Sequence, residues 1–205
     1  MGSLQGKKIA IVATDGFEQS ELEQPKQMLE QEGAQCHVIA PKEGSIKGWD
    51  NKDWGRDVPV DRTLDSIAAD DYDAIVLPGG VMNPDKLRQE QRAVRLVQDI
   101  YRQGKVVAAI CHGPWMLVES GIARGHELTS WPSLETDIRN AGGNWVDEQV
   151  VASEGVVTSR KPDDIPAFVQ KITEEMNEGL HDSRTQRRSM AVLNGNEPSG
   201  QATIM

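Results

Sequence analysis

Five short runs of apolar, mostly β-branched residues divide the chain, and residues typical of turns follow them. Near-continuous apolar runs, without alternating polar residues, indicate strands that are covered on both faces, as in a parallel sheet. Polar or glycine-containing loops follow the first, third and fourth runs directly. The predicted strands are residues 8–14, 35–40, 74–77, 106–110 and 156–159.

The segments between these strands have apolar residues at helical spacing, and most of them stop at a glycine, as helices commonly do. Strands that alternate with helices predict right-handed βαβ units. The pattern therefore predicts an α/β fold around a mostly parallel central sheet. The predicted helices are residues 20–32, 91–103, 114–120, 133–140 and 164–178.

Two stretches depart from this alternation. Residues 41–63 hold Trp49 and Trp54 among glycines and charged residues, which predicts an insertion folded as a small hairpin at the sheet edge. Residues 179–205 are polar and aperiodic, so we expect a C-terminal tail that is disordered or extended, or that binds a partner. Residues 1–178 are long enough to form one α/β domain.

The charge balance narrows the range of partners. The 205 residues include 32 acidic and 22 basic side chains, a net charge of −10, so a nucleic acid or an anionic membrane surface is not expected as a partner. The sequence shows no apolar run of membrane-spanning length and no signal peptide. Its two cysteines form no Cys-x-x-Cys pair. These features predict a cytoplasmic protein.

The strongest chemical signal is the sequence AICHGP at residues 109–114. An apolar strand ends, a cysteine follows at once, and a predicted helix begins just beyond it. Small residues two positions before and after Cys111, Ala109 and Gly113, permit the sharp turn of a nucleophile elbow. We therefore predict that Cys111 is a nucleophile rather than a structural core cysteine. Its place at a helix N-terminus predicts a lowered thiol pKa.

Two other loops are expected to meet Cys111, because ligands of open α/β sheets bind outside the carboxyl ends of the strands. One loop is DGFE at residues 15–18, and the other is Pro-Gly-Gly at residues 78–80. Glycine lets the backbone approach a ligand closely, so we expect Gly79 and Gly80 to line the site. The backbone N–H of Gly80 is then a candidate oxyanion donor.

A carboxyl and an imidazole complete the predicted site. We expect Glu18 to be protonated and to donate to the sulfur, because a buried carboxyl beside a thiolate does not ionise readily. His112 is placed to act on Cys111 if the elbow turns its ring toward the thiol, and its backbone N–H is a second oxyanion donor.

The remaining histidines and the second cysteine are expected to be structural. His37 lies in a predicted strand, His126 follows a glycine at a turn, and His181 lies in the tail. Cys36 lies in the middle of a strand and is expected to be buried and inert. No cluster of histidine, cysteine and carboxylate residues has ligand spacing in the sequence, so neither a metal nor a cofactor is expected.

In sequence and in order, these loops resemble the PfpI family, in the superfamily of the parkinsonism-associated deglycase with its class I glutamine amidotransferase-like fold. The resemblance covers roughly residues 7–178. It rests on DGFE at 15–18, LPGG at 77–80, NPDKLR at 83–88, AICHGP at 109–114, NAG at 140–142 and TSRKPDD at 158–164.

The resemblance implies a flavodoxin-like three-layer sandwich that assembles as a homodimer or a higher homo-oligomer. It implies that Cys111 is the nucleophile, that His112 is its partner and that Glu18 contacts the sulfur. The amides of Gly80 and His112 would form the oxyanion site. Asp85 would reach across a subunit interface to the histidine of the partner.

The implied function is a cysteine-dependent stress-response enzyme that acts on a small carbonyl or glycated substrate, as a glutathione-independent glyoxalase or a deglycase. An intracellular cysteine peptidase is an alternative with the same thiol. A non-enzymatic redox sensor or holdase chaperone is an alternative of another class. Glutamine amidotransfer is disfavoured, because residues 144–178 contain no histidine for the His-x-Glu pair that this chemistry uses.

Overall fold

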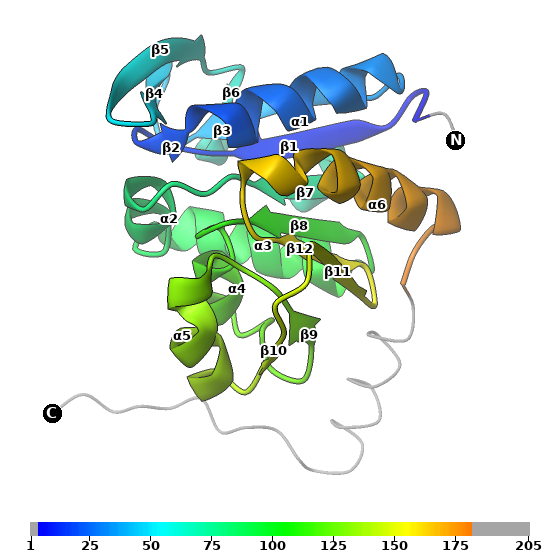
Figure 1. Cartoon of the computed structure of the whole chain (residues 1–205). Helices are drawn as coiled ribbons and strands as arrows, with labels where there is room; N and C mark the ends of the chain where they lie inside the picture. Colours follow the sequence, from blue (N-terminus) through cyan, green and yellow to red (C-terminus); the bar gives the residue numbers. More distant parts are fainter. Residues whose placement is uncertain (1–3, 182–205) are drawn as a thin grey trace, which may run out of the picture.

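The computed structural model describes residues 4–181, and a seven-stranded sheet forms its centre (Figure 1). The strands are β1 (Lys8–Val12), β3 (Gln35–Ala40), β6 (Arg62–Thr63), β7 (Ala74–Leu77), β8 (Val106–Ile110), β11 (Val150–Ser153) and β12 (Val156–Ser159). Their order is β11-β12-β8-β7-β1-β3-β6, and every neighbouring pair is parallel except β11 with β12. The predicted α/β fold with a mostly parallel sheet is confirmed.

Helices cover both faces of this sheet, because successive residues of a strand point to opposite sides. The helices are α1 (Gln19–Gln31), α2 (Met82–Leu87), α3 (Gln91–Arg102), α4 (Trp115–Glu119), α5 (Glu135–Asn140) and α6 (Ile165–Glu178). In β1, Ile9 and Ile11 join the core beneath α1 and α6. Ala10 and Val12 join the core beneath the other helices. Three layers result, as Figure 1 shows.

The five predicted strands are present, and the predicted helices match the observed ones to within about two residues at most ends. The elements that were not predicted include α2, the short edge strand β6, and β11, which pairs antiparallel at the other edge. Pro84 and polar neighbours interrupt the apolar pattern of α2, which explains why its sequence does not indicate a helix. A 3-10 turn precedes α5 where the sequence predicted one continuous helix.

The predicted hairpin is present, but its position differs from the prediction. Strands β4 (Ser45–Asp50) and β5 (Asp53–Pro59) form an antiparallel pair, and β4 pairs with β2 (Phe17–Glu18) rather than with the central sheet. The Gly16 amide donates to the carbonyl of Lys47, and the Lys47 amide donates to the carboxylate of Asp15. These two hydrogen bonds hold the hairpin there. The hairpin therefore stands over the carboxyl end of β1, where the other loops meet (Figure 1).

Short elements complete the described chain. They are β9 (Glu127–Leu128), β10 (Asn144–Trp145) and the 3-10 turns Leu64–Ser66, Ala69–Asp71, Pro132–Leu134 and Pro162–Asp164. After α6, the His181 amide donates to the carbonyl of Gly104 at 2.8 Å. The rest of the predicted tail lies outside the described residues. Within residues 4–181, no helix combines the length and hydropathy that a membrane span requires.

Candidate active site

A sharp turn joins β8 to α4 and presents Cys111. The residue has φ of 62°, a left-handed conformation that is uncommon for a residue with a side chain. The Gly113 amide closes the turn on the carbonyl of Ile110 at 2.8 Å. A Cβ at Gly113 would lie 2.4 Å from the carbonyl oxygen of Leu77, so only glycine fits there. This is the strand–turn–helix geometry of a nucleophile elbow.

The elbow turns the ring of His112 toward the neighbouring thiol. Its Nδ1 lies 3.2 Å from Cys111 Sγ, and its Nε2 lies 3.4 Å from the hydroxyl of Ser133. Trp131 stacks on the ring and Trp115 meets it edge-on. Burial lowers the pKa of His112, so the ring is neutral at neutral pH and one nitrogen can accept a proton. The ring is thus held within one chain by a hydroxyl and two indoles.

The carboxyl that meets the thiol belongs to Glu21, not to Glu18. Glu21 is completely buried, and its Oε2 accepts the Gly79 amide at 2.8 Å. Its other oxygen, Oε1, is buried without a hydrogen-bond partner among the described residues, and the carboxyl group interacts with the Cys111 thiol. Burial, with a smaller contribution from Glu18, raises the pKa of Glu21 to about 8. At neutral pH Glu21 therefore carries a proton that it can donate to sulfur.

The prediction of Glu18 as the sulfur contact is wrong in position, by three residues. Glu18 lies at the mouth of the site, where its Oε1 accepts the hydroxyl of Ser20 at 3.1 Å. Glu21 could have been found from the sequence, because it lies on the same helical face as the buried residues Leu22, Pro25 and Leu29. A carboxyl within an apolar stripe is rarely buried without a partner or a task.

The predicted acidic thiol is also wrong in direction. Burial is the largest influence on Cys111 and raises the pKa of its thiol, and Glu21, once it is ionised, raises it further. The amides of Gly80 and His112 donate to the sulfur and oppose this shift. Because α4 has only five residues, its dipole is too small to overcome the desolvation.

Gly79 and Gly80 allow the Glu21 carboxyl and the Cys111 thiol to lie close together. A Cβ at Gly79 would lie 2.6 Å from the Glu21 carboxyl and 2.7 Å from the Cβ of Cys111. Gly80 has φ of 72°, and a Cβ there would lie 2.6 Å from the carbonyl oxygen of Gly16. Any side chain at Gly79 would therefore separate the two groups. The predicted close approach of both glycines to the site is present.

The buried amide of Asn83, which the sequence did not single out, joins two of the loops. Its Oδ1 accepts the backbone N–H of Thr14 at 2.8 Å, and its Nδ2 donates to the carbonyls of Pro78 and Gly79. The loops after β1 and β7 are thereby fixed relative to each other. Asn83 lies next to Pro84 in the unpredicted helix α2, and this explains why sequence periodicity did not indicate it.

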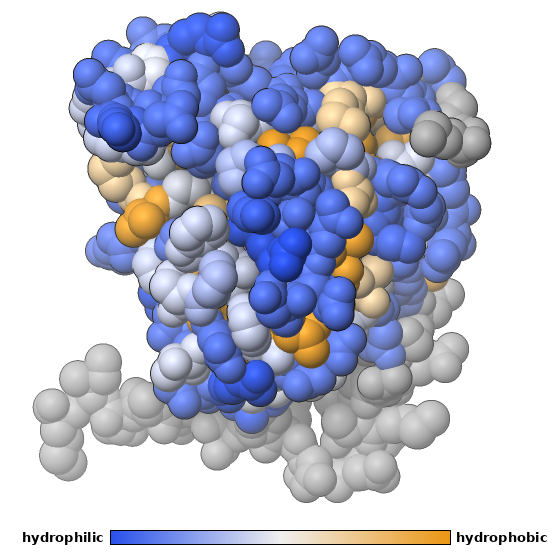
Figure 2. Space-filling view, in the orientation of Figure 1, coloured by the Kyte–Doolittle hydropathy of each residue, from blue (hydrophilic) through white to orange (hydrophobic). Residues whose placement is uncertain are grey.

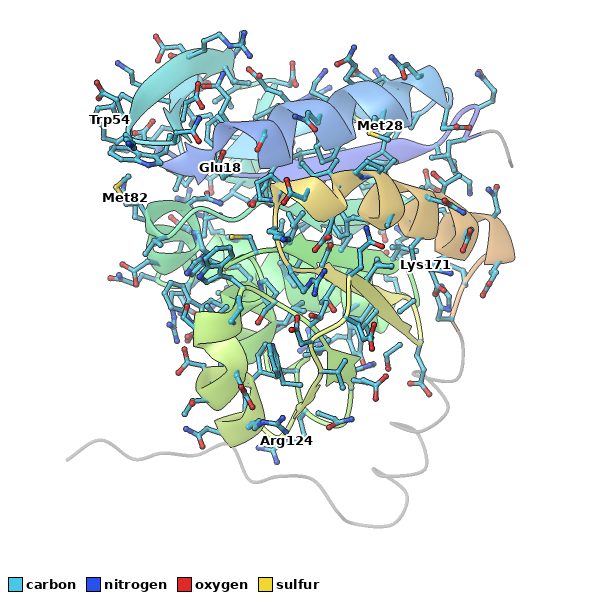
Figure 3. The ribbon with its side chains drawn as sticks, in the orientation of Figure 1. Glu18, Met28, Trp54, Met82, Arg124 and Lys171 are labelled. Carbon is cyan, nitrogen blue, oxygen red and sulfur yellow. The ribbon has the colours of Figure 1, made fainter. Side chains whose placement is uncertain are left out.

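A cavity of about 520 Å³ opens above the sulfur. Its floor carries Cys111 and Glu21, and its rim includes Glu18. Figure 3 shows Glu18 at the start of α1, Met82 on α2 and Trp54 on the hairpin, all at this edge of the molecule. The lining residues are Gly16, Glu18, Glu21, Trp49, Asn51, Gly80, Val81, Met82, Cys111, His112, Trp131 and Pro162.

Asp85 lies outside this cavity. It is an exposed residue of α2, and the described chain gives its carboxylate no hydrogen bond to His112. The reach of Asp85 into a partner subunit therefore stays a prediction. The structure also removes one argument for it, since Ser133 and the two tryptophans already orient the ring of His112.

His37 and His126 have structural surroundings, and the structure adds one group of possible metal ligands. His37 and His126 bond to the hydroxyls of Tyr72 and Tyr101 respectively. At the end of α6, one side-chain ligand atom from each of three residues lies within 4.8 Å of the others, although the sequence suggested no such group. These residues are Glu175, Glu178 and His181.

The DJ-1/PfpI family model matches residues 7–175 of the chain. General stress protein 18 of Bacillus subtilis is 40% identical over 165 residues, covering 80% of this chain and 94% of that protein. Protein/nucleic acid deglycase 2 of Escherichia coli is 39% identical over 164 residues, covering 79% and 93%. YraA of Bacillus subtilis, provisionally named a cysteine protease, is 38% identical over 165 residues, covering 79% and 94%.

A solved structure gives the same result for the fold. A two-domain protein of Anabaena variabilis, with DJ-1/ThiJ/PfpI-like and ferritin-like domains, superposes with a TM-score of 0.79 at 35% identity. The match covers 83% of this chain and 48% of that one. The family model spans every residue that lines the cavity, from Gly16 to Pro162.

Proposed function

Because the chain belongs to the DJ-1/PfpI family, we propose that it is a cysteine-dependent stress-response enzyme that acts on reactive carbonyls, as a glutathione-independent glyoxalase or a deglycase. The observation that carries the proposal is the set of groups around one sulfur. His112 Nδ1 lies 3.2 Å from Cys111 Sγ, two backbone amides donate to it, and the Glu21 carboxyl lies beside it with a pKa of about 8.

These groups support addition of the thiol to an aldehyde. The Cys111 sulfur bonds to the carbonyl carbon, and its proton passes to His112 Nδ1. The carbonyl oxygen takes up the electron pair of the π bond as an oxyanion. The amides of Gly80 and His112, which donate to the sulfur before the reaction, would stabilise that charge, and protonation gives a hemithioacetal.

For a 1,2-dicarbonyl, proton transfers complete the reaction without an outside oxidant. A base removes the proton from the carbon that bears sulfur, and a proton returns at the neighbouring carbonyl carbon. The product is a thioester of a 2-hydroxy acid. Water then hydrolyses the thioester, releases the acid and restores the thiol. His112, which is neutral and next to the sulfur, is suited to carry these protons.

Peptide hydrolysis is the second candidate, and the resemblance to YraA favours it. The same thiol would attack a peptide carbonyl, but the substrate would have to enter a compact cavity rather than an extended groove. A non-enzymatic redox or chaperone role is the candidate of another class.

One experiment separates these candidates. Methylglyoxal consumption with 2-hydroxy acid release, and digestion of fluorescent casein, are measured for wild type and Cys111→Ala. We expect consumption by wild type only, with a rate loss of at least about a thousandfold in the variant, as for other removed nucleophiles. Casein digestion without carbonyl turnover would favour the peptidase, and neither activity would favour the non-enzymatic role.

We further propose that the protein is a homodimer or a higher homo-oligomer in which Asp85 of one subunit assists His112 of its partner. The exposed position of Asp85 on α2 is compatible with this role. Contacts between α2 and α4 place it on the same side of the sheet as the helix that follows the elbow.

A further inference from the structure

We propose that the cavity selects carbonyl substrates whose non-reacting part is a cation, such as a guanidinium or an ammonium group, and that Glu18 and Trp49 produce this selectivity. The inference rests on the proposed function, because it assumes that the protein acts on carbonyl substrates. Its first test, however, uses only the reactivity of Cys111 and does not require turnover.

The ionisable side chains at the cavity are acidic. Among the described residues, its lining includes Glu18 and Glu21 but neither lysine nor arginine. Asp50 lies close enough to Glu18 to add a further negative charge. Lys86, on the adjoining helix α2, donates its ammonium to the carbonyl of Asp15 at 3.0 Å. An anion that enters therefore meets acidic side chains and no cation among the described lining residues.

The two glutamates have different tasks. Glu21 lies beside the sulfur on the floor and interacts with the reacting group. Glu18 lies on the rim, where the hydroxyl and the backbone N–H of Ser20 both donate to it. Partial burial raises the pKa of Glu18, and these two donors oppose that shift because they stabilise its charged form. Glu18 is therefore the residue that can meet the end of a substrate away from its carbonyl.

Aromatic rings strengthen the preference for a cation. Trp49 and Trp131 both line the cavity, and indole is the side chain that attracts cations most strongly. Trp49 is fixed in place, since its Nε1 donates to the carbonyl of Asn51 at 3.2 Å and Trp54 packs edge-on against it. Trp131 is 41% exposed and stacks on His112.

The hairpin places Trp49 next to Glu18 at the cavity. Trp49 belongs to β4, which pairs with β2, and in this pair Glu18 lies opposite Trp49. The indole and the carboxylate are thus neighbours on adjacent strands, so that one bound cation can meet both. Apolar residues lie beneath the hairpin at the same edge of the molecule (Figure 2). The insertion that interrupts the α/β alternation therefore forms one side of the specificity site.

The test compares two thiol reagents of opposite charge. A trimethylammonioethyl and a sulfonatoethyl methanethiosulfonate each react with the Cys111 thiolate, which forms a disulfide and displaces methanesulfinate. Rates are measured by peptide mass mapping and divided by the rates with 2-mercaptoethanol. The expected cation-to-anion ratio is about tenfold or more in wild type, falling several-fold in Glu18→Gln and less steeply in Trp49→Leu.

A matched control separates the site from the overall charge. Glu43→Gln removes the same charge at an exposed position outside the cavity, and its ratio is expected to equal that of wild type. A wild-type ratio near one would overturn the proposal. So would a ratio that falls equally in Glu18→Gln and Glu43→Gln, since net charge rather than the rim would then be the cause.

A second arm uses carbonyl substrates. The kcat/KM for the methylglyoxal adduct of an arginine amide is compared with that for 4,5-dioxopentanoate, an anionic 1,2-dicarbonyl, in wild type and Glu18→Gln. We expect the variant to lose preference for the cationic substrate by several-fold. Charge-selective labelling without any turnover would refute the proposed function and leave the selective cavity in place. Turnover with an unchanged preference would refute the selectivity and leave the function.

Discussion

Cysteine followed by histidine occurs twice in this chain, and only one pair forms a reactive arrangement. Cys36 and Cys111 are 5% and 8% exposed, and burial raises the pKa of both thiols, that of Cys36 to about 12. In the first pair the backbone is a regular strand, so His37 points to the opposite face and bonds to Tyr72. In the second, the left-handed turn brings His112 to the sulfur.

The comparison shows that burial and sequence neighbours do not identify the nucleophile. The difference lies in the groups that surround each sulfur. The pKa of Cys36 responds to Glu30 and Lys26, two charged residues of α1. Cys111 receives two amide donors, an imidazole acceptor and a protonated carboxyl. A thiolate can therefore be stabilised at Cys111 despite its burial.

The largest expected effect tests whether the site around Cys111 and His112 is complete within one subunit. The surroundings of Cys36 and His37 lie within one chain. If a partner's carboxylate orients His112, Asp85→Asn should lower kcat/KM by about a hundredfold or more and leave the fold and Cys111 alkylation intact. Mixing this variant with Cys111→Ala should restore activity, because a mixed dimer contains one complete site. The exposed Asp57→Asn is the control.

Two results would contradict the shared site. One is a fully active monomer in sedimentation, since no partner would then be present. The other is absence of complementation when subunit exchange has been demonstrated. In either case Ser133, Trp115 and Trp131 would be sufficient to orient the ring.

A smaller effect tests whether the Glu21 carboxyl contributes to the difference in reactivity between Cys111 and Cys36. Glu21→Gln keeps a donor toward sulfur and an acceptor for the Gly79 amide, whereas Glu21→Leu removes both. We expect iodoacetamide alkylation of Cys111 at pH 7 to be about tenfold slower in the Leu variant than in the Gln variant, a difference of one good hydrogen bond. Alkylation of Cys36 serves as the internal reference and should not change. Equal Cys111 rates in wild type and both variants would exclude Glu21 from thiol activation.

The last effect concerns stability rather than reactivity. Glu21 ionises near 4.5 in the unfolded chain and near 8 in the folded one. Between these values the unfolded state binds fewer protons, so the free energy of unfolding falls as pH rises from 4.5 to 8. Glu21→Gln lacks this slope, so its stability relative to wild type should rise by at most about 4 kcal/mol between pH 4.5 and pH 8, because the shift from 4.5 to about 8 is converted at 1.36 kcal/mol per pKa unit. Urea unfolding at pH 5 and pH 8 measures it, and a pH-independent difference would contradict the shifted pKa.

The sequence was most informative where one local pattern decides the structure. The five central strands are continuous apolar runs, and the small residues Ala109 and Gly113 around Cys111 allow only a tight turn. Features set by tertiary contacts were misplaced or missed. The acidic loop directed attention to Glu18, although the packing of α1 on the sheet brings Glu21 to the thiol.

Tertiary contacts also explain why the position of the hairpin and the direction of the Cys111 pKa shift differ from the predictions. Turn residues around Trp49 and Trp54 indicated a hairpin, but pairing with β2 depends on Asp15 and Lys47, which are far apart in the sequence. The helix N-terminus suggested an acidic thiol, whereas the fold buries Cys111 beside Glu21 and reverses the shift. Desolvation is a property of the assembled core and has no local sequence signal.

The left-handed backbone at Cys111 has a consequence for anyone who engineers this protein. A non-glycine residue in that conformation costs about 1–3 kcal/mol, which the surrounding structure has to offset. Glycine at position 111 would remove most of this cost. Selection for heat resistance alone would therefore favour variants without the thiol, and would yield a more stable protein that has lost its proposed nucleophile.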